Sequence, residues 1–125
     1  MEQELFDVLS ALEMRAEKER MQQGETEIMD PDAAKFVSLL AVSKNAKSIV
    51  EVGSGVGYST LWLAYAALAT GGKVITCEID PAKADETRSA DRIAAAGRSN
   101  APRLPQRSAH KSWPKTKSDQ APAET

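Results

Sequence analysis

The chain has 125 residues and a formal net charge of −2, which leaves room for one domain at most and excludes a strong overall positive field of the kind that attracts polyanions. A single cysteine, Cys77, excludes an internal disulfide framework and a site of several thiolates, and we expect its side chain to face the core. The N-terminus lacks signal-peptide features and the apolar stretch 61–70 is too short to span a bilayer, so the sequence predicts a soluble cytoplasmic protein.

An amphipathic helix is predicted over the first twenty residues. Four apolar side chains recur there at helical spacing: Leu5, Val8, Leu9 and Leu12. Gly24 is expected to end this helix. Its apolar stripe fits two uses that the sequence leaves open, namely packing against its own domain or forming a surface for a partner or a dimer.

A second helix is predicted from Asp30 and Pro31, which are typical of an N-cap and a first turn, to Asn45. Five residues form its predicted apolar face: Phe36, Val37, Leu39, Leu40 and Val42. Two helices therefore precede any strand.

The rest of the regular pattern alternates strands and helices. Residues 48–52 (SIVEV) predict a buried strand of a parallel sheet, residues 59–70 a helix, and residues 73–78 a second strand. Asp80 and Pro81 repeat the cap-and-proline start of a helix. Its predicted apolar face contains Ala84, Thr87, Ala90, Ile93 and Ala94. The order α-α-β-α-β-α predicts an α/β, Rossmann-like fold, shorter than the roughly 150 residues that six strands require.

The composition changes at Gly97, the predicted C-cap of that last helix. Residues 1–97 hold 10 Lys and Arg against 16 Asp and Glu, whereas residues 98–125 hold 6 against 2, with four of the six prolines. Since the second segment has few apolar side chains, it cannot offset the entropy cost of ordering. We predict that this basic tail is disordered. The abrupt change in composition indicates translation in another frame or a prematurely ended gene.

The segment that carries chemistry is 51–60, EVGSGVGYST, between a predicted strand and a predicted helix. Its glycines, Gly53, Gly55 and Gly57, allow a sharp turn and close approach of a ligand, and the N–H groups that open the next helix favour a polar or anionic group. Glu78 ends the next strand, where a carboxylate can accept hydrogen bonds from ribose hydroxyls. Together these features predict a nucleoside-cofactor site.

Spacing distinguishes two classes of cofactor. The dinucleotide fingerprint requires G-x-G-x-x-G/A, and the third position counted from Gly53 is Tyr58, whose ring is expected to crowd a pyrophosphate. This disfavours an NAD-type oxidoreductase without removing it as an alternative. A non-catalytic interaction protein acting through the first helix is the other alternative.

The form E-x-G-x-G-x-G resembles motif I of class I S-adenosylmethionine-dependent methyltransferases. Over residues 28–97, the Asn-Ala-Lys-strand-Glu-x-Gly-x-x-x-Gly-Tyr-Ser run and the strand end CEIDP resemble the cation-dependent O-methyltransferases of the caffeoyl-CoA and catechol type. The resemblance implies the N-terminal part of a Rossmann-like methyltransferase fold, with a helix over 1–27 ahead of a partial cofactor-binding domain over 28–97 and the tail 98–125 behind it. It also implies methyl transfer from S-adenosylmethionine to a hydroxyl of a small phenolic molecule.

Positions carried over from this family imply the roles of individual residues. Glu51 would lie near the amino end of the methionine moiety, Ser59 would bond the carboxylate region, and Glu78 would hold the ribose. The complete set of implied cofactor-binding residues is Glu51, Gly53, Ser54, Gly55, Tyr58, Ser59 and Glu78.

A divalent cation serves the intact relatives, whose ligands are carboxylates and an asparagine on later strands. Nothing after Gly97 matches those ligands. The resemblance therefore implies no metal ligand and no catalytic residue in this chain, which we expect to bind the cofactor weakly and to transfer no methyl group. The small-molecule cofactor and a second copy of the chain are the expected partners, with no membrane and no nucleic acid.

Overall fold

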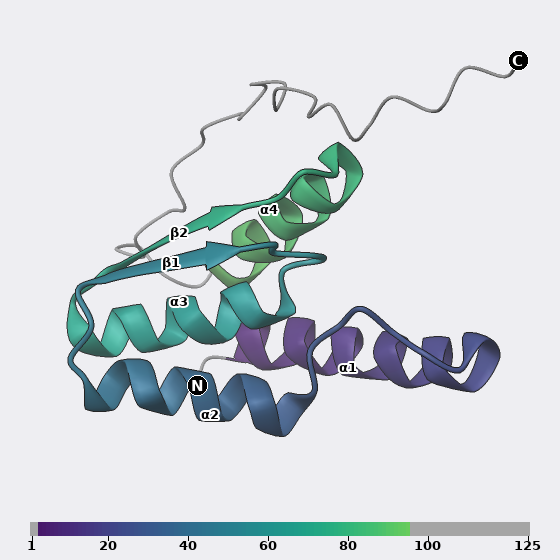
Figure 1. Cartoon of the computed structure of the whole chain (residues 1–125), viewed down its shortest axis with the longest axis horizontal. Helices are drawn as coiled ribbons and strands as arrows, with labels where there is room; N and C mark the ends of the chain where they lie inside the picture. The colour runs from purple at the N-terminus through teal and green to yellow at the C-terminus, as the bar shows by residue number, and fades with distance from the viewer. Residues whose placement is uncertain (1–2, 96–125) are drawn as a thin grey trace, which may run out of the picture.

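The computed structural model describes residues 3–95, which form four helices and two strands (Figure 1). In chain order the elements are α1 (Gln3–Gln23), α2 (Pro31–Ser43), β1 (Ser48–Val52), α3 (Tyr58–Thr70), β2 (Lys73–Cys77) and α4 (Pro81–Ala95). Their order and type confirm the sequence prediction. The predicted C-cap at Gly97 and the predicted disordered tail over 98–125 lie outside the described residues.

The two strands lie parallel, and Val52 is opposite Cys77 in the register. A parallel pair needs a crossover connection, which α3 supplies. Ile49 of β1 and Val74 of β2 join a small apolar cluster with Leu63 on α3, so α3 covers one face of the sheet (Figure 1).

The opposite face of the sheet is open among the described elements, and this corrects two expectations. The side chains of Val50 and Val52 are 66% and 87% exposed, so β1 is not the buried strand that its sequence predicts. Cys77 is also exposed rather than directed into the core. The strand was predicted to be buried because helices normally cover both faces of a parallel sheet. Here α4 packs mainly against α1 and α3, so it does not cover the second face.

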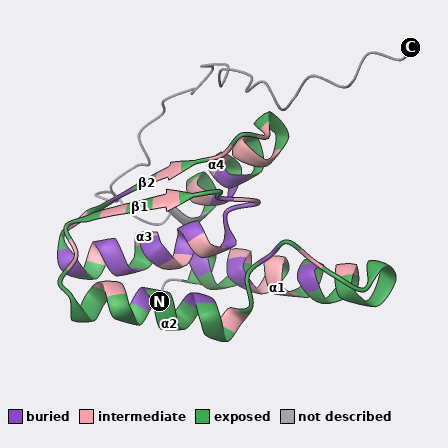
Figure 2. Ribbon diagram, viewed as in Figure 1, coloured by how far each residue is buried: buried purple, intermediate pink, exposed green. Residues whose placement is uncertain are grey.

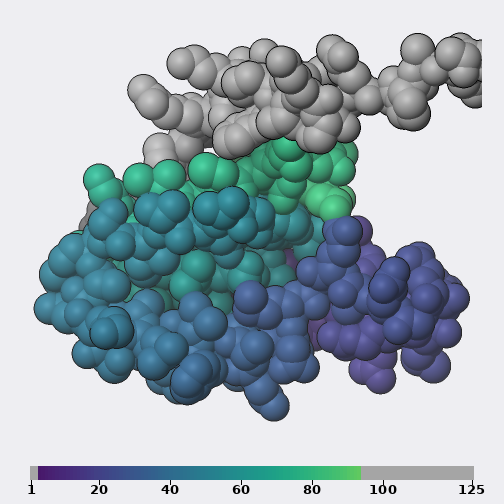
Figure 3. All heavy atoms as spheres, in the orientation of Figure 1, coloured from purple at the N-terminus to yellow at the C-terminus, as the bar shows by residue number. Residues whose placement is uncertain are grey.

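The core is centred on α3, whose residues are the most consistently buried in the structure (Figure 2). An element that is apolar around its whole circumference is expected to be covered on all sides. Tyr58 and Leu61 of α3 meet Leu5 and Leu9 of α1 in the main apolar cluster. The apolar stripe of α1 is therefore used within its own domain. The C-terminal half of α1 projects beyond α2, α3 and the sheet (Figure 3).

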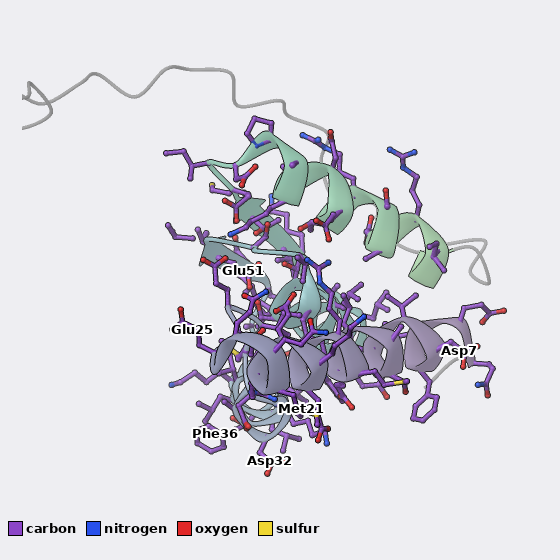
Figure 4. All side chains as sticks on the ribbon, turned by 90° about the vertical axis from the view of Figure 1, so that its right-hand side faces the viewer. Asp7, Met21, Glu25, Asp32, Phe36 and Glu51 are labelled. Atoms are coloured by element: carbon purple, nitrogen blue, oxygen red, sulfur yellow. The ribbon has the colours of Figure 1, made fainter. Side chains whose placement is uncertain are left out.

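The contact between α2 and α3 does not use the predicted apolar face of α2. The buried residues of α2 are Ala34 and Ser38, and the Ser38 hydroxyl donates to the carbonyl of Trp62 at 3.0 Å. Five residues expected in the core are 40–66% exposed: Phe36, Val37, Leu39, Leu40 and Val42. Phe36 points away from the rest of the molecule (Figure 4). Small side chains at a contact let two helices approach closely, so the small face of α2 packs and the large one does not.

On α4, Thr87 and Ala90 are buried as predicted, whereas Ile93 is 55% exposed. This face is poor in large apolar side chains, and an exposed ion pair of 2.5 Å between Arg15 of α1 and Glu86 adds to its contact with α1.

None of the helices in residues 3–95 combines the length and the apolarity needed to cross a bilayer.

Candidate functional site

The glycine-rich loop, residues 53–57, joins β1 to α3 at the carboxyl ends of the two strands. Gly53, Gly55 and Gly57 have φ angles of +86°, +56° and +96°, a region that L side chains rarely adopt. A Cβ atom added at Gly53 or Gly55 would meet nothing within 4 Å, whereas one at Gly57 would lie 3.0 Å from the Cα of Thr87. The first two glycines therefore leave the backbone open, and the third allows α4 to pack closely.

The loop is anchored to β2 and α4. The amides of Gly53 and Ser54 donate to the carbonyl of Cys77 at 2.8 and 3.2 Å. The Ser54 hydroxyl is buried 3.1 Å from the Thr87 hydroxyl, which itself donates to the carbonyl of Gly55 at 3.0 Å. Because its side chain is directed at α4 and its amide donates to Cys77, Ser54 can offer a ligand only its backbone carbonyl.

Three hydroxyl groups converge on the carboxylate of Glu51, which lies near the end of β1 (Figure 4). Ser59 donates to Oε2 at 2.6 Å, Thr76 donates to Oε1 at 2.8 Å, and Thr60 also donates to Oε1. Glu51 and Ser59 were predicted from the sequence, whereas Thr60 and Thr76 were not. A signal for Thr76 exists, because the parallel register pairs it directly with Glu51.

Glu78, just after β2, holds the glycine-rich loop from the other strand. Its carboxylate accepts hydrogen bonds from the backbone N–H of Gly55 at 2.7 Å and of Asp80 at 3.0 Å. The amide of Asp80, and then those of Gly55 and Ile79, hold the pKa of Glu78 below its usual value, against the opposing effect of partial burial. The ionised form of Glu78 is therefore part of the architecture of the loop.

We expect acid to release this anchor. Since the pKa of Glu78 is lowered in the folded state, its contribution to stability is complete above the unfolded value of about 4.3 and is lost as the pH falls through the lower folded value. NMR shifts of the Gly55 and Asp80 amides should stay constant from pH 7 to about 4.5 and change together below it. Glu78→Gln should abolish this shared transition, and its persistence in that variant would contradict the assignment.

Tyr58 does not face the open side of the loop, which corrects the reason for disfavouring NAD. Its side chain is 2% exposed, and its hydroxyl donates to Oε1 of Glu13 on α1 at 2.5 Å. Burial and this hydrogen bond both raise the pKa of Tyr58, so the hydroxyl stays protonated. The ring cannot crowd a pyrophosphate, and only the backbone of Tyr58 can face a ligand.

The structure thus brings together the acidic residues and the loop that the sequence singled out. Glu51 and Glu78 flank residues 53–57, and Ser59 is bonded to Glu51. Within residues 3–95 no group of three or more His, Cys, Asp or Glu side chains is placed to hold a metal ion.

Comparisons with known proteins place the chain in a family. Residues 3–120 match the family model described as O-methyltransferase, a range that extends beyond the motifs on both sides. A catechol O-methyltransferase of Niastella koreensis is 47% identical over 53 residues, which are 42% of this chain and 24% of that protein. The crystal structure of the O-methyltransferase from Bacillus cereus in complex with SAH is similar with a TM-score of 0.55 and 32% identity, over 75% of this chain and 39% of that one.

This chain therefore spans about a quarter and about two fifths of those relatives. The structural likeness confirms the Rossmann-like methyltransferase fold expected from the element order. Together with the matched range, it shows that the chain belongs to the O-methyltransferase family.

Proposed function

We propose that residues 3–95 form the part of an S-adenosylmethionine site that binds the methionine moiety and the ribose, of the kind that serves methyl transfer to a hydroxyl of a small phenolic molecule, and that this chain by itself transfers no methyl group. The observation that carries this proposal is the placement of Glu51 and Glu78 at the ends of two parallel strands, on either side of the open glycine-rich loop. The SAH complex of the Bacillus cereus relative and the catechol O-methyltransferase of Niastella koreensis support it.

The methionine moiety carries an ammonium and a carboxylate, and this end of the sheet offers a counterpart for each. Glu51 supplies a carboxylate for the ammonium. The first turn of α3 supplies backbone N–H groups that have no partner within the helix, and these favour a carboxylate. Ser59 lies in the first turn of α3, and its hydroxyl donates a hydrogen bond to Glu51.

The ribose has two hydroxyl donors, which suit the carboxylate of Glu78. An ionised carboxylate has about four acceptor positions, and the amides of Gly55 and Asp80 occupy one on each oxygen, with the amide of Ile79 also directed at the group. Acceptor capacity therefore remains for a ribose hydroxyl, on a group whose orientation the backbone already sets.

The bound cofactor supplies an electrophilic methyl group on a sulfonium centre, and the described residues bind and orient it. No catalytic residue is proposed among them. The homodimer and the cytoplasmic location expected from the sequence stay predictions, and sedimentation velocity would test the first.

Calorimetric titration of the full chain with SAH and with NAD tests the proposed function. We expect weak binding of SAH, with a dissociation constant of about 1 mM corresponding to about −4.1 kcal/mol. We expect no binding of NAD, because the chain belongs to the O-methyltransferase family and not because of Tyr58. Glu78→Ala should remove SAH binding, whereas Asp85→Ala, which alters an exposed carboxylate paired with Arg88 on α4, should not. Tighter binding of NAD than of SAH, or unchanged affinity in Glu78→Ala, would overturn the proposal.

A further inference from the structure

We propose that Thr60 and Thr76 are positioning residues that orient the carboxylate of Glu51 toward the ammonium group of the ligand, an inference that rests on the proposed function. Thr60 lies in the first turn of α3 and Thr76 on β2, and both donate to the same oxygen of Glu51, Oε1. The carboxylate is thereby held by donors from two different elements.

The count of acceptor positions shows which oxygen remains for a ligand. Each oxygen of an ionised carboxylate has two lone pairs. Oε1 of Glu51 accepts from both threonines and is filled, whereas Oε2 accepts from Ser59 alone. The remaining acceptor position is therefore on Oε2, and a ligand ammonium is expected to bind there.

Both threonines are placed with little freedom. Thr60 is 1% exposed, and a β-branched side chain in a helix has a restricted χ1 angle. Thr76 is the direct partner of Glu51 in the parallel register, so the backbone pairing of the sheet sets its distance from the carboxylate. Neither threonine hydroxyl donates to Oε2, the oxygen left for the ligand. Both residues are therefore expected to affect the ligand only through the orientation of Glu51.

Thr70, in the last turn of α3, shows what a purely structural threonine does in the same helix. It is 7% exposed, and its hydroxyl donates to the backbone carbonyls of Ala46 and Ala67. Thr60 instead directs its proton to an acidic side chain at the proposed site. Thr70→Val is therefore a matched control for Thr60→Val.

The test compares two ligands by calorimetry on the full chain. SAH carries the amino acid end, and 5′-methylthioadenosine has the same nucleoside thioether without it. In Thr60→Val and Thr76→Val we expect SAH to bind about tenfold more weakly, which corresponds to about 1.4 kcal/mol, with unchanged affinity for 5′-methylthioadenosine. Thr76→Ser, which keeps the hydroxyl, should restore SAH binding, and Thr70→Val should change the affinity for neither ligand.

The possible outcomes separate this inference from the proposed function. If the wild-type chain binds SAH and the valine variants lose nothing, or lose affinity equally for both ligands, the inference is overturned and the proposed function stands. If the wild-type chain binds neither ligand, the proposed function is overturned and the inference with it. Should Thr60→Val fail to fold, the pair Thr76→Val and Thr76→Ser decides, because Thr76 is only partly buried.

Discussion

Gly57→Ala is expected to lower the free energy of unfolding by about 2–5 kcal/mol. Two costs add at this position. The φ angle of +96° is strained for any residue with a Cβ atom, and that atom would lie 3.0 Å from the Cα of Thr87, within the backbone of α4. Urea denaturation followed by circular dichroism measures the loss.

Gly24→Ala is the matched control, because Gly24 has a φ angle of +82° but nothing within 4 Å of an added Cβ atom. Its loss should therefore be confined to backbone strain, about 1–2 kcal/mol. Equal losses in the two variants would show that close packing of α4 on the loop contributes nothing at Gly57. A larger loss at Gly57 should also weaken SAH binding, since this residue immediately precedes α3 and the side chains that meet Glu51.

Tyr58→Ala is expected to cost about 3–5 kcal/mol of stability, because Tyr58 is among the largest fully buried side chains of the described chain and joins α3 to α1. Tyr58→Phe keeps the ring and removes only the hydrogen bond to Glu13, so its cost should be about 1 kcal/mol. Thermal and urea unfolding of both variants measure the difference. A loss in Tyr58→Phe as large as that in Tyr58→Ala would show that the hydrogen bond, rather than packing, dominates.

Alkali gives a second measurement on the same residue. The pKa of Tyr58 is raised in the folded state. The contribution of the protonated hydroxyl to the free energy of unfolding is therefore fully present below the pKa of the unfolded chain, about 10, and is lost as the pH rises toward the pKa of the folded chain. The wild-type chain should therefore lose stability above about pH 10 by more than Tyr58→Phe does. Parallel losses in the two proteins would contradict this assignment.

Local signals in the sequence were sufficient for the order of the elements and for part of the site. Asp30 caps α2 by accepting from the amides of Asp32 and Ala33, as the Asp-Pro pair predicts. The glycine-rich loop and Glu78 could be predicted because φ angles and strand ends depend on residues close in the chain. Each of these features is set by neighbours within a few positions, so the sequence alone carries the necessary information.

Contacts between distant segments decided the rest. The apolar residues of α2 could not be ranked from periodicity, because the fit against α3 selects the small face with Ala34 and Ser38. The sequence placed the Tyr58 ring where it would crowd a pyrophosphate, whereas the structure buries it against α1. The role that we propose for Thr76 depends on the parallel register, which places it opposite Glu51. By itself, the sequence determined which elements form and where the loop that we propose as a ligand site lies. Only the tertiary structure decided which side chains face that loop, because a side chain's direction depends on the elements packed around it.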